Sequence, residues 1–135
     1  MLFLPIISFS QGLKGSYLLF IQLNKRITIN LSKKHFSLEE ACYIYVGSAF
    51  GAGGLKSRVS HHLLKEKTQR WHIDFLTTSP YSEIVGVVYF IDQKVECYLG
   101  KLFSSFSSLE PVFGFGNSDC KANCDSHLYK IVKSK

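Results

Sequence analysis

The sequence predicts a mixed α/β (α+β) domain, in which helices flank a small antiparallel or mixed β-sheet. Three apolar runs at 15–23, 43–47 and 83–91 are rich in β-branched and aromatic residues, as buried strands are. Segments with apolar residues at helical spacing lie between and after these runs. With 135 residues, of which 46% are hydrophobic and 19% charged, the chain is long enough for one core and too short for two.

The first half of the chain contains a second strand signal and a helix-start signal. After the strand at 15–23, residues 26–30 alternate between apolar and polar, which indicates a more exposed strand behind a short turn. Ser37 and Glu40 have the spacing of a capping box, which marks the start of a helix. We therefore expect a short helix to begin near Ser37, before the strand at 43–47.

A glycine-rich loop and a helix follow that strand. Glycine occupies three of the four positions 51–54, so residues 48–54 are expected to form a loop. From 55 to 67 the apolar residues follow the helical period. The remaining predicted elements are a helix at 71–77, a strand at 83–91, a helix at 95–106, an irregular stretch at 113–123 and a short strand at 127–132.

The organisation predicted is one domain at 15–135, preceded by an arm or strand at 1–14. The first seven residues are apolar but lack the charged start of a signal peptide. Pro5 interrupts them well before the length of about 20 residues that a membrane span needs. These features predict a cytoplasmic protein without a membrane segment. In a reducing cytosol, the four cysteines are expected to remain thiols.

The charge of the chain points to an anionic partner. The net charge is +6 and the isoelectric point is about 9.2, and Lys and Arg neutralise phosphates with release of counterions. A charge run is usually a solvated helix face, but this one leads away from the candidate site described next. We therefore predict a track for nucleic acid, most simply DNA. Its basic residues, on or just after the helix at 55–67, are Lys56, Arg58, Lys65, Lys67 and Arg70.

Five further residues have the chemistry of phosphodiester hydrolysis. Arg58 supplies a permanently charged planar cation for the transition state, and His62 lies one helical turn away on the same face. Tyr17, Tyr45 or His62 can orient the attacking water or take its proton. Glu96 starts a later helix and can hold Mg²⁺ or Mn²⁺ through oxygen. Each residue alone also has an ordinary structural interpretation. The tyrosines are typical of a strand core, Arg58 and His62 of a solvated helix face, and Glu96 of the first turn of a helix.

A second candidate constellation lies near the end of the chain. Cys120, Cys124 and His127 have spacings of three and two residues between them, and thiolates and imidazole are good ligands for structural Zn²⁺. His72 or Cys97 would supply a fourth ligand. The spacing differs from the common paired-cysteine patterns, so ordinary packing or a free thiol is the competing interpretation.

An ordered series of motifs runs through residues 15 to about 131. It resembles the GIY-YIG endonuclease superfamily, and more closely an uncharacterised branch in archaea and bacteria that is sometimes fused to endonuclease III-type repair enzymes. The residues that carry the resemblance are Gly15-Ser16-Tyr17, Tyr45-Val46-Gly47-Ser48-Ala49, Gly51, Gly53-Gly54-Leu55, Arg58, His61-His62, Trp71-His72-Ile73-Asp74, Glu96-Cys97, Gly114-Phe115-Gly116-Asn117-Ser118-Asp119-Cys120 and Ser126-His127-Leu128.

The resemblance implies a small antiparallel sheet flanked by helices and a metal-dependent nuclease site. Tyr17 and Tyr45 would line this site, Arg58 would contact the scissile phosphate, His62 would assist the water and Glu96 would bind Mg²⁺. It also implies a DNA-repair protein as a partner. The chain departs from the superfamily pattern in having Ser16 in the first motif and a longer glycine loop, and Asn117 is the candidate for its late asparagine.

Two other functions remain open from the sequence. A DNA- or RNA-binding module without catalysis needs only the basic track. A zinc-stabilised interaction domain needs Cys120, Cys124 and a histidine within bonding distance of one another. The oligomeric state is not predicted.

Overall fold

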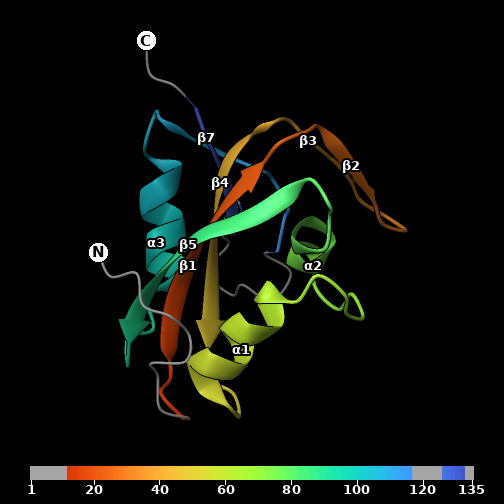
Figure 1. The fold of residues 1–135 in the computed structure, drawn as a ribbon. Helices are drawn as coiled ribbons and strands as arrows, with labels where there is room; N and C mark the ends of the chain where they lie inside the picture. The colour runs from red at the N-terminus through yellow and green to blue at the C-terminus, as the bar shows by residue number, and fades with distance from the viewer. Residues whose placement is uncertain (1–11, 117–125, 133–135) are drawn as a thin grey trace.

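The computed structural model describes residues 12–116 and 126–132 and confirms the mixed α+β class (Figure 1). Its main sheet has the strand order β5-β1-β4-β7-β6, and neighbouring strands are antiparallel. Residues 1–11 lie outside the described part, so the arm expected at 1–14 stays a prediction. The strands of this sheet are β1 (Gly15–Leu23), β4 (Ala41–Ala49), β5 (Ser82–Ile91), β6 (Leu109–Pro111) and β7 (Leu128–Ile131).

A separate two-stranded sheet is formed by β2 (Ile27–Asn30) and β3 (His35–Leu38), which pair antiparallel. The strand β3 replaces the helix start that the spacing of Ser37 and Glu40 predicts, so that prediction is wrong. Burial along β3 alternates with period two, as in a strand with one face on a core. The Ser37 hydroxyl accepts hydrogen bonds from the Arg26 guanidinium at 2.8 and 3.0 Å, which ties β3 to the turn before β2.

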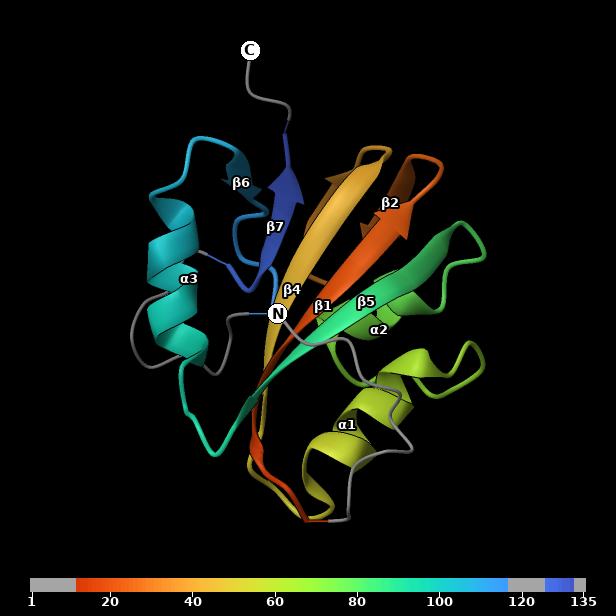
Figure 2. The same cartoon turned by 60° about the vertical axis from the view of Figure 1, so that its left-hand side comes forward.

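Helices cover both faces of the main sheet, with α1 and α2 on one face and α3 on the other (Figures 1 and 2). The helix predicted at 55–67 ends four residues early, because Leu64 adopts an extended conformation. The helices predicted at 71–77 and 95–106 are confirmed to within two residues at each end. The helix bounds are α1 (Gly54–Leu63), α2 (His72–Thr77) and α3 (Glu96–Ser104).

The two faces of β1 belong to two different hydrophobic cores. Tyr17 and Leu19 join the core beneath α1 and α2, whereas Leu18 joins the core beneath α3. Side chains alternate between faces along a strand, so a strand covered on both sides is apolar almost throughout. The same alternation places Tyr45 of β4 on the face of Tyr17, and this shared face carries the candidate site.

The glycine-rich loop before α1 allows the helix to pack against the residues that directly precede β1. Leu55 donates its backbone N–H to the carbonyl oxygen of Leu13 at 2.7 Å. Gly54 has a φ of +62°, and a β-carbon there would overlap the Leu13 carbonyl. Only glycine combines a left-handed conformation with so close a backbone approach. This contact places the first turn of α1 beside the start of β1.

Gly47 has a comparable role within the sheet. It is paired with Tyr17 in the register of β1 and β4, and a β-carbon at position 47 would overlap the phenol ring of Tyr17. Tyr17 is 1% exposed, so its ring has little room to move aside. The absence of a side chain at Gly47 therefore lets the Tyr17 ring lie over β4.

We expect Gly47→Ala to lower the free energy of unfolding by about 1–3 kcal/mol, because overpacking a filled core has a cost of this order. Urea denaturation followed by circular dichroism measures the change. Gly51→Ala is the matched control, since a β-carbon at Gly51 meets nothing within 4 Å and should change stability by less than about 0.5 kcal/mol. Equal stability of the two variants would contradict the placement of the ring over Gly47.

Candidate active site

A cavity of about 210 Å³ is lined by residues of β1, β4, α1 and the start of α3. The structure brings into this cavity all five side chains that the sequence nominates for catalysis and metal binding. These residues are Tyr17, Tyr45, Arg58, His62 and Glu96. The other residues of the lining are Ser48, Trp71, Gly116 and His127.

Two buried phenols form the floor of the site on the sheet. Tyr17 and Tyr45 lie on adjacent strands, two residues out of register, and are 1% and 9% exposed. Burial raises the pKa of Tyr17 well above its ordinary value; Tyr45 adds to this rise and the charge of Arg58 opposes it. Burial also raises the pKa of Tyr45, with the charge of Glu96 as the second cause. Both side chains are therefore neutral phenols at neutral pH.

His62 faces Tyr17 from α1, with 2.6 Å between Nε2 and the phenol oxygen. Burial lowers the pKa of His62 to about 3, and the charge of Lys67 adds to this effect, so the ring is neutral. The guanidinium of Arg58, which can only donate, also interacts with the Tyr17 hydroxyl. Tyr17 therefore directs its own proton to Nε2 of His62. The Nδ1 atom of His62 is buried without a hydrogen-bond partner among the described residues.

Arg58 is held by an aromatic ring from the segment before α2. Its guanidinium carbon lies 4.5 Å from the ring centroid of Trp71. A guanidinium over an indole face is stabilised by the ring quadrupole, and the contact also limits the rotamers of a long side chain. Both residues line the cavity, so the cation is held at its wall.

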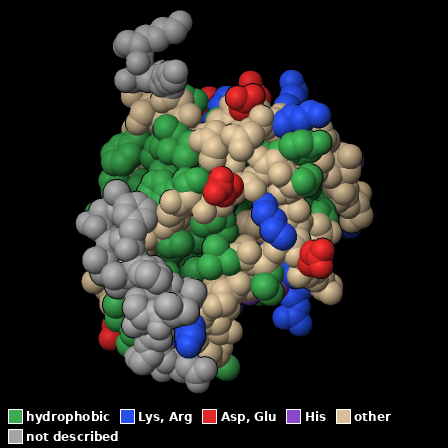
Figure 3. All heavy atoms as spheres, in the orientation of Figure 1, with side chains coloured by type: hydrophobic (Ala, Val, Ile, Leu, Met, Phe, Trp, Pro, Cys, Tyr) green, Lys and Arg blue, Asp and Glu red, His purple; other side chains and the backbone are tan. Residues whose placement is uncertain are grey.

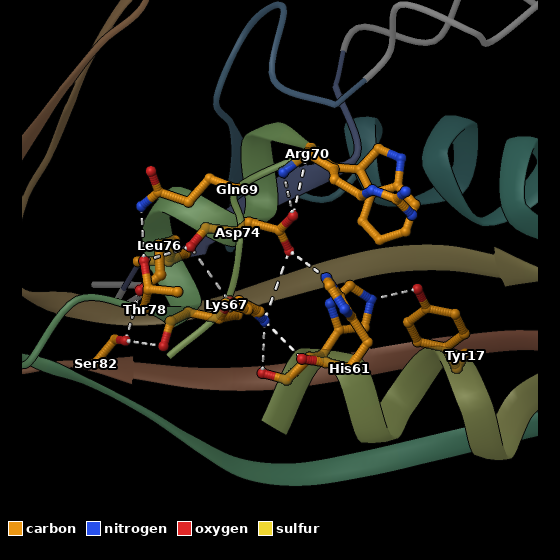
Figure 4. Close-up of polar contacts among 12 residues, drawn as sticks. Tyr17, His61, Lys67, Gln69, Arg70, Asp74, Leu76, Thr78 and Ser82 are labelled. Carbon is orange, nitrogen blue, oxygen red and sulfur yellow. Dashed lines mark hydrogen bonds and ion pairs between the residues drawn. The ribbon is translucent and has the colours of Figure 1, made fainter. Parts of the chain in front are cut away.

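Trp71 is positioned in turn by the buried carboxylate of Asp74, which accepts its backbone N–H. Figure 4 shows the contacts of Asp74 with Arg70, His61 and Lys67. Asp74 Oδ2 accepts the backbone N–H groups of Arg70 and Trp71 at 2.8 and 3.0 Å. Its Oδ1 lies 3.2 Å from His61 Nε2 and 3.6 Å from Lys67 Nζ. Burial alone would raise the pKa of Asp74, but these hydrogen bonds and charges together lower it. Asp74 is therefore an ionised anchor between the end of α1 and the start of α2.

Glu96 reaches the site because Ser16 fixes the segment before α3. The buried Ser16 hydroxyl donates to the carbonyl oxygen of Gln93 at 2.8 Å and accepts the backbone N–H of Val95 at 3.1 Å. Ser16 directly precedes Tyr17. Two neighbouring residues of β1 therefore supply a phenol of the site and fix the position of the helix that carries the Glu96 carboxylate. Ser16 thus has a structural role in this chain.

His127 lies beside Glu96, with 3.9 Å between His127 Nδ1 and Glu96 Oε2. Its backbone is fixed on both sides: its N–H donates to the carbonyl oxygen of Phe115 at 2.8 Å, and its carbonyl oxygen accepts the N–H of Val46 at 2.9 Å. Burial lowers the pKa of His127, so this ring is neutral as well. The cavity therefore combines one cation, one carboxylate and neutral phenols and imidazoles.

The described residues contain no group of three or more His, Cys, Asp or Glu side chains arranged for a metal ion. Glu96 supplies one carboxylate, which fits a hard cation such as Mg²⁺ that takes its remaining ligands from water and substrate. The zinc site predicted from Cys120, Cys124 and His127 stays a prediction, because both cysteines lie outside the described residues. His127 itself faces the cavity.

The predicted basic track divides into two groups. Lys65 donates to the carbonyl oxygen of Ser79 at 2.8 Å, and Lys67 donates to the carbonyl oxygens of His61 and His62 at 2.7 and 3.2 Å. Both ammonium groups thus stabilise the fold. Lys56 lines a second cavity of about 340 Å³ with Gly53, Ser57 and Ser60 at the start of α1. The side chain of Arg70 is exposed.

Sequence reasoning missed the roles of Trp71 and His127. The sequence assigns no role in the site to Trp71, whereas the structure places Trp71 in the cavity lining. Asp74 is fully buried, and His72 accepts the N–H of Gly116 at 2.9 Å. The feature that could have indicated Trp71 as a site residue is an aromatic side chain that follows Arg58 and His62 in the sequence. His127 was assigned to a different constellation because cysteines precede it.

The fold and this cavity define a small α+β domain with a site of two phenols, two imidazoles, a guanidinium and a carboxylate. The chain belongs to the family DUF123, a domain of unknown function, which matches residues 16–135. Comparison with curated proteins gave no match, and comparison with solved structures gave none either. Within the described residues, no helix is long and apolar enough to cross a membrane.

His62 is expected to make stability depend on pH. Its pKa is near 6.5 in the unfolded chain and about 3 in the folded protein, so its contribution is complete above pH 6.5 and is lost as pH falls toward 3. Between pH 7 and pH 5.5 this linkage lowers the free energy of unfolding by about 1.2 kcal/mol. His62→Gln should abolish that part of the decrease in urea denaturation at the two pH values.

His35→Gln provides the matched control, because His35 is exposed on β3. This variant should keep the pH dependence of the wild-type protein. A decrease in His62→Gln as large as in His35→Gln would show that His62 titrates normally in the folded state.

Proposed function

We propose that this chain is a GIY-YIG-type endonuclease that hydrolyses phosphodiester bonds in nucleic acid with a divalent metal ion. The observation that carries the proposal is the lining of one cavity by Tyr17, Tyr45, Arg58, His62 and Glu96. A cation, a proton-transfer pair and a carboxylate are the groups that this reaction requires. The family match leaves activity open, so the chemistry of the site is the support.

Arg58 would bind the scissile phosphate. Its contact with Trp71 leaves the edge of the guanidinium, with its N–H groups, as the hydrogen-bonding surface. A planar fork matches two phosphate oxygens and gains strength as negative charge builds up in the transition state. The neighbouring phenols and imidazoles carry no competing negative charge when neutral. The phosphate would therefore meet a cation whose neighbours in the cavity lining, apart from Glu96, carry no charge.

Tyr17 and His62 would act as a pair on the attacking water. A phenol with a raised pKa is a weak base while it keeps its proton. Because Nε2 of His62 accepts that proton across 2.6 Å, Tyr17 can give it up as it takes one from water. The charge of Asp74 favours the imidazolium that forms, against the larger opposing effects of burial and of the charge of Lys67, which hold the pKa of His62 at about 3. The proton thus moves from water to Tyr17 and from Tyr17 to His62.

Glu96 would hold Mg²⁺ or Mn²⁺ through its carboxylate oxygens. The bound ion would polarise the phosphate and offset its charge. Ser16 would fix the distance of Glu96 from Tyr17 through the segment before α3. The carboxylate that holds the metal ion and the phenol that acts on the water would then both be positioned by β1.

The nucleic acid would approach along α1 and α2, with DNA as the expected substrate. Figure 3 shows apolar side chains gathered over α3, whereas most Lys and Arg side chains on that face lie away from this patch. Three exposed side chains there, Tyr98 and Leu102 of α3 and Phe106 just after it, are unsuited to a polyanion. Lys56 and Arg70 remain candidates for backbone contacts on the α1 and α2 side. The cytoplasmic location and a DNA-repair partner are parts of this proposal.

We expect Arg58→Ala, Glu96→Ala and Tyr17→Phe each to lower nicking of plasmid DNA by about 100-fold or more, since each removes a group that acts in the transition state. Assays would use supercoiled plasmid and structured RNA with Mg²⁺, with Mn²⁺ and with chelator. Tyr17→Phe keeps the ring over Gly47 and removes the hydroxyl alone.

Arg26→Ala is the matched control for charge, because Arg26 bonds to Ser37 in the small sheet and lies outside the cavity lining. Its activity should equal that of the wild-type protein. Nicking that survives both Arg58→Ala and Glu96→Ala unchanged would overturn the site. Salt-sensitive binding without any cleavage would favour the non-catalytic DNA- or RNA-binding module, and zinc found by elemental analysis would favour the interaction domain.

A further inference from the structure

We propose that His127 is a positioning residue of this site, whose Nδ1–H holds one oxygen of the Glu96 carboxylate so that the other oxygen is presented to a metal ion. This inference rests on the metal-binding role that the proposed function gives to Glu96. His127 lines the same cavity as Glu96 and approaches it to 3.9 Å, within ion-pair range and just beyond hydrogen-bond distance.

The two side chains differ in burial. The side chain of Glu96 is 24% exposed, whereas that of His127 is 5% exposed. The backbone of His127 is hydrogen-bonded on both sides, to Phe115 and to Val46. Ser126 adds a local turn, because its hydroxyl accepts the N–H of Leu128 at 2.8 Å. The imidazole of His127 is thus held in place beside the Glu96 carboxylate.

The environment of the imidazole selects its tautomer. Nε2 of His127 is buried without a hydrogen-bond partner among the described residues, and Nδ1 faces the Glu96 carboxylate. The proton therefore belongs on Nδ1, where the N–H dipole meets the negative charge of the Glu96 carboxylate.

A carboxylate whose orientation is fixed by an outer hydrogen bond binds a cation better than a carboxylate without that bond. Metal-ligating carboxylates are generally held by outer partners, and loss of such a partner weakens metal binding by about 10- to 100-fold. His127, which directly precedes β7, would supply this contact, and its role is to place Glu96.

The first test is the tautomer of His127 in the metal-free protein. A two-bond ¹⁵N–¹H correlation spectrum at pH 8, with His127→Gln to assign the ring, should show the proton on Nδ1. Glu96→Gln should change the Nδ1 chemical shift, because it alters the acceptor. A proton on Nε2, or an Nδ1 shift indifferent to Glu96→Gln, would overturn the proposal whether or not the protein binds metal.

The second test measures Mn²⁺ affinity by electron paramagnetic resonance. His127→Asn keeps a donor near the Nδ1 position and should retain affinity within about 3-fold, whereas His127→Gln places its amide near the Nε2 position and should lose about 10-fold. Wild-type affinity in both variants would overturn the proposal. Mn²⁺ binding unchanged by Glu96→Gln would instead refute the metal role in the proposed function, and the tautomer measurement would still decide the contact between His127 and Glu96.

Discussion

The buried carboxylate of Asp74 holds together the parts of the molecule that form the candidate site. It is the only Asp or Glu side chain buried completely among the described residues. Desolvating a carboxylate costs several kcal/mol unless hydrogen bonds and a counter-charge replace water, and Asp74 has both. Its partners, the Arg70 and Trp71 N–H groups, His61 and Lys67, join α1 to α2. A domain stabilised by about 5–15 kcal/mol has little tolerance for a break in such a network.

The consequence of this anchor is electrostatic as well as structural. Lys67 is turned inward by Asp74, and its charge helps to lower the pKa of His62. Trp71, fixed by the same carboxylate, holds Arg58 at 4.5 Å from its ring centroid. The network therefore sets two properties of the cavity at once, a neutral imidazole and a placed cation. Burial of Tyr17 completes this state, because a neutral phenol needs an acceptor and His62 provides one.

The sequence predicts those parts of the structure that depend on period and on spacing. The long strands and the common helix face of Arg58 and His62 follow from periods of 2 and 3.6 residues. The strands β3 and β6 are short and lack long apolar runs, so neither was predicted. The hydrogen bonds of Lys65 and Lys67 to backbone carbonyl oxygens were not predicted either. A run of basic residues has the same sequence pattern whether its ammonium groups contact water or carbonyl oxygens. Trp71 and His127 enter the site through long-range contacts that no local pattern encodes.

Glu96 and the phenols meet in one cavity beside the start of β7. The helix α3 lies on the opposite face of the sheet from α1, so its first residue would ordinarily be separated from Tyr17 and His62 by the strands. Among the described residues, the register between β4 and β7 covers residues 43–45 of β4, and a hydrogen bond from Val46 to His127 continues it. Glu96, at the start of α3, and His127, directly before β7, line the cavity together with the phenols. Both faces of the sheet thus contribute to one site, which His127 joins at the start of β7.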